Sequence, residues 1–478
     1  MLVFCMDFIK LIYIITFYFL SVGNSFSNDL PNIASDKEFL IDKKLELNIS
    51  LSALANLEKL NLLYQHPEID YYLSYLLDRI LVSNGIKDDD YSILLVGNID
   101  LNAFALPGKY MGINSGLLLS TKDESELASV ISHELAHITK KHISRMIYAQ
   151  KKATNASLAA LLLAILASNS NSDLTTGALA GAQANLAQNY FSYSQAHEKE
   201  ADYAGFEYMK KSGFSPFSSI SFLKTLEKKY SFTNSQIPAY LSTHPLTSER
   251  VINLTGRVSN LDFKLIEDSL EYKMCKIILK VKSYNKSTLI DRYSKLVKEN
   301  RHQNFFDVAR KFELLLTLAA LKKEQEFLEI KKEFESNSIQ NFILSTIYAR
   351  FFYNKYSKDD IKKYDYYFLA TLDGENYQFL IDEMVEKMVA NEDFDLIPPD
   401  YLDYDLKTIT IRQIKSLLRY YAHFNNDCAF KVLNIYLNFF RGNFKIVSNQ
   451  IAETNLFCKN EQSIKKHFFN IERHFNEL

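Results

Sequence analysis

The stretch Ser132-His133-Glu134-Leu135-Ala136-His137 reads H-E-x-x-H and follows an apolar pattern with helical spacing. Residues four apart share one face of an α-helix, so His133 and His137 can offer two imidazoles to one metal ion. Glu134 lies about 100° round the helix from His133, close enough to act on a metal-bound water without being a ligand. The pattern therefore predicts a helix with two zinc ligands and a general base; the alternative is a surface helix with two histidines.

A second acidic segment, Glu198-Lys199-Glu200-Ala201-Asp202, can complete such a site. A zinc ion bound by H-E-x-x-H needs a carboxylate from another helix, and we predict Glu198 in that role. Asp202 lies one turn further on the same face, where it can accept the free ring N–H of a ligating histidine. We therefore predict Asp202 and Glu134 as the catalytic residues. The alternative is a solvated, charged helix face.

Length and composition narrow the class of protein. The 478-residue chain is long enough for more than one domain, and its net charge of −2 argues against a general nucleic-acid binder. The four cysteines show no C-x-x-C spacing, which argues against a zinc ribbon or a thioredoxin motif. We expect a buried free thiol at each of Cys275, Cys428 and Cys458, with a single Cys428–Cys458 disulfide as the alternative.

The N-terminus resembles a secretory signal peptide. Residues 11–22 are almost wholly apolar, they follow Lys10, and the small residues Gly23, Ser25 and Ser27 come next. We predict a cleaved leader over residues 1–27 and therefore export from the cytoplasm. An uncleaved membrane anchor is the alternative.

A second apolar stretch, residues 156–167, is followed by the Ser/Asn-rich residues 168–172. The stretch is shorter than the roughly twenty residues that a membrane-spanning helix needs. We predict a buried or groove-lining helix, with contact to a membrane surface as the alternative. The polar residues after it are expected to form a mobile loop that could act as a lid.

Three short β-rich segments precede the motif helix. They are predicted at residues 91–96, 102–106 and 110–114, after a helix over residues 67–83. Segment 102–106 is the predicted edge of this sheet, and we expect it to bind substrate as an added strand through Asn102, Ala103 and Phe104. Ser120 or Thr121 is expected to cap the motif helix.

These elements resemble the M48 peptidase family over roughly residues 91–251. The likeness rests on Asn102-Ala103-Phe104-Ala105-Leu106-Pro107-Gly108, on Gly116-Leu117-Leu118, on Glu126-Leu127-Ala128, on the H-E-x-x-H motif and on Glu198 to Asp202. The resemblance implies a zincin-like domain with one zinc ion. It also implies that His133, His137 and Glu198 bind the zinc and that Glu134 is the catalytic base.

The segment from Thr243 to Val251 matches an H-P-x-x-x-x-R element of periplasmic members of this family. The resemblance makes His244 a candidate fourth ligand that occupies the open zinc position in a resting state. The alternative is a loop histidine that stabilises an oxyanion. Arg250 is expected to form a structural ion pair. His142 lies about half a turn from His133 on a continuous helix and is predicted not to share the metal.

After residue 258 the sequence changes to long helical stretches with polar breaks. They are predicted at residues 270–281, 305–320, 342–353, 411–424, 429–440 and 444–452. This texture indicates a helical repeat, and the resemblance implies a tetratricopeptide-like domain over residues 259–478, after a catalytic domain over residues 28–258. A plain helical bundle is the alternative.

The predicted fold is α+β and predominantly helical: a zincin-like domain with a small sheet, then an all-α domain. The function that the residues and the resemblance imply is a zinc-dependent endopeptidase of the periplasm, with misfolded or stalled outer-membrane proteins as substrates. The same resemblance implies docking on the outer-membrane β-barrel assembly machinery. The net charge predicts no nucleic-acid partner, and the short apolar stretch 156–167 predicts membrane contact that is peripheral at most. One rival is a helical-repeat adaptor or chaperone with a silenced zinc centre, and another is an integral-membrane protease.

Overall fold

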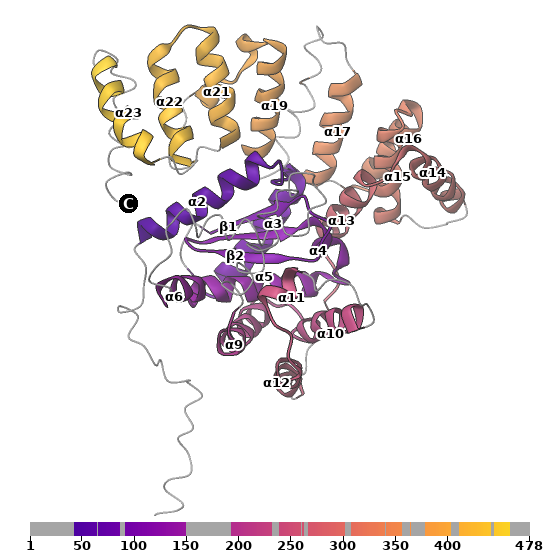
Figure 1. Cartoon of the computed structure of the whole chain (residues 1–478). Helices are drawn as coiled ribbons and strands as arrows, with labels where there is room; N and C mark the ends of the chain where they lie inside the picture. Colours follow the sequence, from indigo (N-terminus) through magenta and orange to yellow (C-terminus); the bar gives the residue numbers. More distant parts are fainter. Residues whose placement is uncertain are drawn as a thin grey trace, which may run out of the picture. The chain divides into compact units, whose positions relative to one another are not determined.

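Helices and one small sheet give the chain an α+β fold that is predominantly helical (Figure 1). The structure, a computed structural model, describes residues 43–64, 66–86, 91–149, 193–231, 239–259, 261, 266–301, 307–339, 341–355, 364, 378–402, 411–440 and 444–458. The signal peptide predicted at residues 1–27, the apolar stretch 156–167 and the loop 168–172 lie outside these residues.

The sheet has the three strands that the sequence predicts. They are β1 (Ser92–Val96), β2 (Ala103–Leu106) and β3 (Tyr110–Asn114), in the order β1-β3-β2. β1 pairs with β3 in parallel, and β2 pairs with β3 antiparallel, with Ala103 opposite Ile113. The hairpin between β2 and β3 contains Gly108 with φ +70°, a conformation that favours glycine. β2 is therefore an edge strand, as predicted.

Helices cover the sheet and continue its core. α2 (Lys43–Lys59) packs Ile49 and Leu57 against Phe104 and Leu106 of β2. α3 (Pro67–Ser83), whose bounds match the sequence prediction, contacts β1. The ring of Phe104 lies over Gly112 on the neighbouring strand, where a Cβ atom would clash with it. The absence of a side chain at this position therefore lets the aromatic ring of the edge strand pack on the sheet.

The motif helix α5 (Glu124–Thr139) is capped by a residue other than the two expected. The side chain of Asp123 accepts a hydrogen bond from the backbone N–H of Glu126 at 2.7 Å. A short helix, α4 (Ser115–Ser120), lies between β3 and α5, and the hydroxyl of Thr121 donates to the Leu118 carbonyl at its C-terminus. The prediction of Ser120 or Thr121 as the cap was wrong because these residues belong to the end of that extra helix.

α5 crosses a second helix, α9 (Gln195–Lys211), at close range. Ala136, Ala201 and Ala204 form a small buried cluster between the two helices. A Cβ atom added to Gly205 would lie 3.0 Å from the backbone N and Cα of His133, so only glycine fits without displacing the backbone. This close approach lets short acidic side chains of α9 reach the histidines of α5.

Three further helices complete the region around α5 and α9. They are α10 (Phe217–Ser231), α11 (Ala239–Thr243) and α12 (Ser248–Val258), while α6 (His142–Ala149) follows α5 directly. α10 contacts α5, and α12 contacts both α9 and α10.

The rest of the described chain is helical. It comprises α13 (Leu270–Lys282), α14 (Lys286–Arg301), α15 (Val308–Ala320), α16 (Glu324–Ser336), α17 (Phe342–Lys355), α19 (Gln378–Asn391), η3 (Phe394–Leu396), α20 (Pro399–Leu402), α21 (Ile411–His423), α22 (Asp427–Phe440) and α23 (Phe444–Phe457). All six predicted stretches are present as helices, and α14, α16, α19, η3 and α20 are additional. Neighbours in sequence pack together, as in α14–α15, α15–α16, α21–α22 and α22–α23. The tetratricopeptide class and the boundary at residue 259 stay predictions.

A disulfide joins Cys428 to Cys458, whose Cα atoms lie 5.6 Å apart. The expectation of free thiols was wrong for these two residues and right for Cys275, which is buried and unpaired. The packing of α22 against α23 brings the two cysteines together, and sequence spacing alone could not establish it. No helix in the described residues is long and apolar enough to span a membrane.

Candidate metal centre

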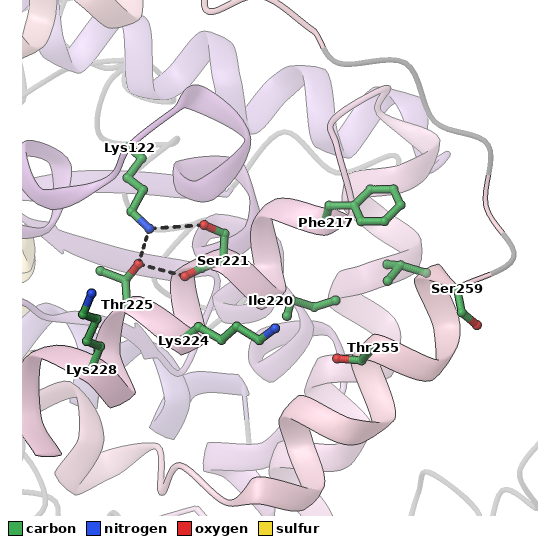
Figure 2. A pocket seen from close by; sticks show the side chains of 10 residues that line it. Lys122, Phe217, Ile220, Ser221, Lys224, Thr225, Lys228, Thr255 and Ser259 are labelled. Atoms are coloured by element: carbon green, nitrogen blue, oxygen red, sulfur yellow. Dashed lines mark hydrogen bonds between the residues drawn. The ribbon is translucent and has the colours of Figure 1, made fainter.

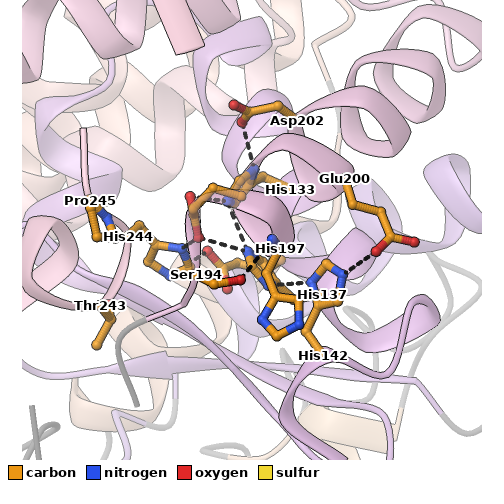
Figure 3. Close-up of polar contacts among 12 residues, drawn as sticks. His133, His137, His142, Ser194, His197, Glu200, Asp202, Thr243, His244 and Pro245 are labelled. Atoms are coloured by element: carbon orange, nitrogen blue, oxygen red, sulfur yellow. Dashed lines mark hydrogen bonds and ion pairs between the residues drawn. The ribbon is translucent and has the colours of Figure 1, made fainter. Parts of the chain in front are cut away.

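Four buried side chains from three segments meet at one point (Figure 3). His133 and His137 come from α5, Glu198 from α9, and His244 follows α11. One donor atom from each lies within 4.8 Å of the others, and each residue is at most 6% exposed. The structure thus brings together all four predicted ligands, including the fourth that the resemblance implied.

The donor atoms lie close enough together to share one ion. His133 Nε2 and His137 Nε2 are 3.0 Å apart, and the two carboxylate oxygens of Glu198 lie 3.4 Å from one ring nitrogen each. His244 Nδ1 lies 3.0 Å from Glu198 Oε1. Zinc bonds of about 2.1 Å place neighbouring donors of a tetrahedron roughly 3.4 Å apart. The four residues therefore fit one zinc ion.

The facing imidazole nitrogens of His133 and His137 need either a proton or a metal ion between them, because two lone pairs 3.0 Å apart would repel each other. His133 Nδ1 lies 3.1 Å from Asp202 Oδ1, so Nδ1 carries a proton, and Nε2 can offer its lone pair to the cluster once it has lost its own proton. Burial lowers the pKa of His133, but the carboxylates of Asp202 and Glu198 outweigh it and raise this pKa to about 9. Without metal, a proton between the two rings can satisfy this contact. A metal ion that binds both nitrogens would displace that proton.

Glu134 lies beside the donor cluster without belonging to it. Its side chain is fully buried, and neither carboxylate oxygen accepts a hydrogen bond from the described residues. His244 Nε2 is 3.5 Å from Oε1, and burial raises the pKa of the carboxyl. A buried carboxyl without a donor is costly. The position therefore suits a group that exchanges a proton with a bound water or substrate.

Asp202 and Arg250 contact the predicted ligand side chains His133 and Glu198. Arg250 donates two hydrogen bonds of 2.7 Å to the Asp202 carboxylate and lies 2.6 Å from Glu198 Oε2. Burial raises the pKa of Glu198, but the charges of His244 and Arg250 outweigh it and hold this pKa well below its usual value. Arg250 thus forms the expected ion pair. Asp202 contacts Nδ1 of His133, where it was predicted to accept a hydrogen bond, and its orienting and catalytic roles stay predictions.

His142 contacts His137, which the sequence did not predict. It lies outside the donor group, as predicted, but its Nδ1 is 2.9 Å from Nδ1 of His137. Its Nε2 is 3.0 Å from Glu200 Oε2. Burial and the neighbouring His137 lower the pKa of His142 to about 2, so the ring is neutral. On a continuous helix His142 would lie about half a turn from His133. However, α5 ends at Thr139, and the chain turns before His142.

Two tyrosines pack against the histidines and were also missed. The ring of Tyr193 lies 3.8 Å from that of His137 and 5.0 Å from that of His244. The ring of Tyr240 stacks on His244 at 4.6 Å with 26° between the planes. These two aromatic contacts keep His244 over the cluster. No sequence motif singles out these tyrosines.

The predicted substrate-binding residues are buried: Ala103 and Phe104 lie in the edge strand β2, and Asn102 directly precedes it. Asn102 is 2%, Ala103 0% and Phe104 8% exposed. The hydrogen bond from Asn114 N–H to the Asn102 carbonyl fixes the register, so the peptide groups of Ala103 and Ala105 point away from β3. α5 contacts β2, which places the edge beside the motif helix. Substrate binding here stays a prediction and requires this edge to open.

A separate cavity of about 1040 Å³ lies away from the cluster (Figure 2). It is lined by Lys122, Phe217, Ile220, Ser221, Lys224, Thr225, Lys228, Thr255, Val258 and Ser259. Lys122 Nζ donates to Thr225 Oγ1 at 2.6 Å on one wall. None of the candidate site residues lines this cavity, so it is distinct from the metal centre.

Comparison with known proteins agrees with this geometry. Residues 67–258 match the model of peptidase family M48. A beta-barrel assembly-enhancing protease of Escherichia coli (strain K12) is 29% identical over 216 residues, which cover 45% of this chain and 44% of that protein. The protein of the same name from Yersinia pestis is 29% identical over 211 residues, covering 44% of this chain and 43% of that one.

A mitochondrial metalloendopeptidase of Schizosaccharomyces pombe is 30% identical over 190 residues, covering 39% of this chain and 52% of that protein. The chain thus spans less than half the length of the two bacterial relatives and about half of this one. M48 metallopeptidases use zinc, which is the ion that the donor cluster fits. The matched segment and the buried cluster within it show that residues 67–258 form a domain of peptidase family M48.

Proposed function

We propose that this protein is a zinc-dependent endopeptidase in which Glu134 is the general base. The observation that supports this most directly is the position of Glu134: it is fully buried, lacks a hydrogen-bond donor among the described residues and lies next to a four-donor cluster. A structural zinc site has no need of such a carboxyl, whereas a peptidase site does.

The residues of the chain divide the chemistry among them. Zinc, when bound, polarises the scissile carbonyl and acidifies a water molecule. Glu134 takes a proton from the attacking water and passes it to the leaving amine. His133, His137 and Glu198 hold the ion, and Asp202 keeps the ring of His133 in its tautomer.

His244 is the proposed control element of the site. As a fourth ligand it silences the centre, and when it swings away it leaves the position free for the reaction. Its ring is 1% exposed and contacts Glu198 and Glu134, which supports the resting arrangement. In the open arrangement the same imidazole could instead stabilise an oxyanion.

The proposed setting is the periplasm, with misfolded or stalled outer-membrane proteins as substrates. Relatives named beta-barrel assembly-enhancing proteases support this setting. The disulfide between Cys428 and Cys458 adds support, because such bonds persist in oxidising compartments. In this proposal the helices after α12 select clients and dock on the β-barrel assembly machinery, and membrane contact is peripheral at most.

One alternative has support from a specific observation. If His244 never leaves the cluster, the chain is a helical adaptor or chaperone with a silenced zinc centre. The tight packing of His244 between Tyr193 and Tyr240 favours that reading.

Three forms of the full chain distinguish these functions: wild type, Glu134→Gln and His244→Ala. Elemental analysis measures bound zinc, and cleavage of an unfolded protein substrate measures activity. We expect one zinc ion per chain, activity lost by at least 10²-fold in Glu134→Gln with zinc retained, and activity retained or raised in His244→Ala. Full activity of Glu134→Gln would refute the catalytic assignment, and inactivity of all three forms would favour the adaptor.

A further inference from the structure

The side of His137 that faces away from the donor cluster contacts another histidine. His142 is 0% exposed, and its Nδ1 lies 2.9 Å from His137 Nδ1. On its other side, His142 Nε2 lies 3.0 Å from Glu200 Oε2, which also accepts a hydrogen bond from Arg145 Nη2 at 2.9 Å. Figure 3 shows the line that His137, His142 and Glu200 form from the cluster outward.

The direction of each hydrogen bond follows from the ligand role of His137. When Nε2 of His137 binds a metal, its proton is on Nδ1, and the hydrogen bond needs an acceptor there. His142 can accept only through an unprotonated Nδ1, so its own proton lies on Nε2 and is donated to Glu200. Every donor in this line has one acceptor, and the carboxylate at the end also receives the Arg145 guanidinium.

We propose that His142 is a positioning residue that fixes the tautomer and ring orientation of His137 for metal binding. The line His137–His142–Glu200 thus orients the ring of His137, as Asp202 orients the ring of His133. This inference rests on the proposed function, because it requires that His137 binds the metal.

The orientation of His142 is itself fixed by its surroundings. Lys141 has φ +54°, and this left-handed residue turns the chain after α5 so that His142, the first residue of α6, returns to His137. His197 of α9 stacks on the His142 ring at 4.6 Å with 20° between the planes. Both ring nitrogens of His142 therefore point at their partners without free rotation.

The experiment uses full-length His142→Phe, His142→Asn and the control His197→Phe. Phenylalanine keeps a ring of similar size but removes the acceptor, whereas the asparagine oxygen can stand in for Nδ1. His197→Phe keeps the stacking and removes no bond to His137. Zinc affinity is measured by competition with a chromophoric chelator, and the visible spectrum of the Co²⁺-loaded protein reports the ligand geometry.

We expect His142→Phe to weaken zinc binding by about 10- to 100-fold and to shift the cobalt spectrum. His142→Asn should recover most of the affinity and the wild-type spectrum, and His197→Phe should match wild type. Unchanged affinity and spectrum in His142→Phe would overturn the proposal, as would an Asn variant that loses as much as the Phe variant.

If His142→Phe does not fold, by circular dichroism, His142→Asn decides alone. A wild-type cobalt spectrum then supports the proposal, and an altered one overturns it. A wild-type chain that binds no zinc would refute the proposed function itself, which is a distinct result from any change between variants.

Discussion

The two histidines of the H-E-x-x-H motif are supported in different ways. His133 is bonded to Asp202, a carboxylate that is 11% exposed and bonded to the buried Arg250. His137 is bonded to the neutral His142, and the charge comes only one step later, at Glu200, whose side chain is 34% exposed. The partner of His133 is a charged and largely buried carboxylate. The partner of His137 is a neutral imidazole, whose own partner Glu200 is partly exposed to solvent.

This difference indicates an unequal division of labour. A carboxylate in direct contact raises the basicity of its histidine more than a neutral imidazole can, and burial protects the interaction from water and salt. The His133 support should therefore contribute more to metal affinity and to stability. The His137 support should mainly set ring orientation.

The largest effect is expected from Asp202→Ala, which removes the charged support. The free energy of unfolding should fall by about 3 kcal/mol, because Arg250 loses a buried partner but keeps Glu198. Zinc affinity should fall by about 100-fold, at the upper end for a group that orients a ligand. Chemical denaturation and chelator competition measure the two quantities.

Glu249→Gln is the matched control for Asp202→Ala. Its pair with Lys199 is more than 60% exposed on both sides and should contribute less than about 1 kcal/mol. If Asp202→Ala changes zinc affinity no more than His142→Phe does, the inequality between the two supports is wrong.

A smaller effect is expected from Gly205→Ala, which acts on both supports at once. The new Cβ would press on the backbone of His133 and push α9, with Glu198, Glu200 and Asp202, away from α5. Overpacking of about 1–3 kcal/mol is offset by about 1 kcal/mol of helix propensity, so a net loss of roughly 1 kcal/mol is expected.

Gly256→Ala in α12 is the control for this change, since nothing lies within 4 Å of the added atom. It should leave stability equal or slightly higher. Thermal unfolding of the two variants side by side tests the claim, and equal behaviour would show that the crossing of α5 and α9 tolerates a methyl group.

The smallest effect is expected from Glu200→Gln. The amide can still accept from His142, and the lost charge is partly screened by water because the side chain is one-third exposed. Unfolding free energy should change by less than about 1 kcal/mol, and zinc affinity by less than about tenfold. A loss as large as that of Asp202→Ala would show that the two supports are equivalent.

Local spacing explains which parts of this site the sequence could predict. His133, His137, Glu198 and Asp202 follow from four-residue spacing within single helices, and the structure brings them together as expected. The three strands and the first residue of α3 follow from equally local patterns. The helix faces and the strands need no knowledge of how distant segments pack, whereas the meeting of Glu198 with the two histidines was expected from zinc chemistry and from the family resemblance.

The features that sequence reasoning missed all depend on chain geometry between elements. His142 reaches His137 only because α5 ends at Thr139 and the backbone turns there. Asp123 is the cap because an extra short helix uses Thr121. Pairing of Cys428 with Cys458 depends on the packing of α22 against α23.

The left-handed residue Lys141 has a consequence for comparing sequences. Because that single residue turns the chain between α5 and α6, the number of positions from His137 to His142 is fixed: one residue inserted or deleted there would carry the imidazole to another side. A histidine five positions after H-E-x-x-H is therefore a recognisable signature of this contact. A related chain that lacks it and has a longer or shorter link after the motif helix would need a different partner for the second histidine of the motif.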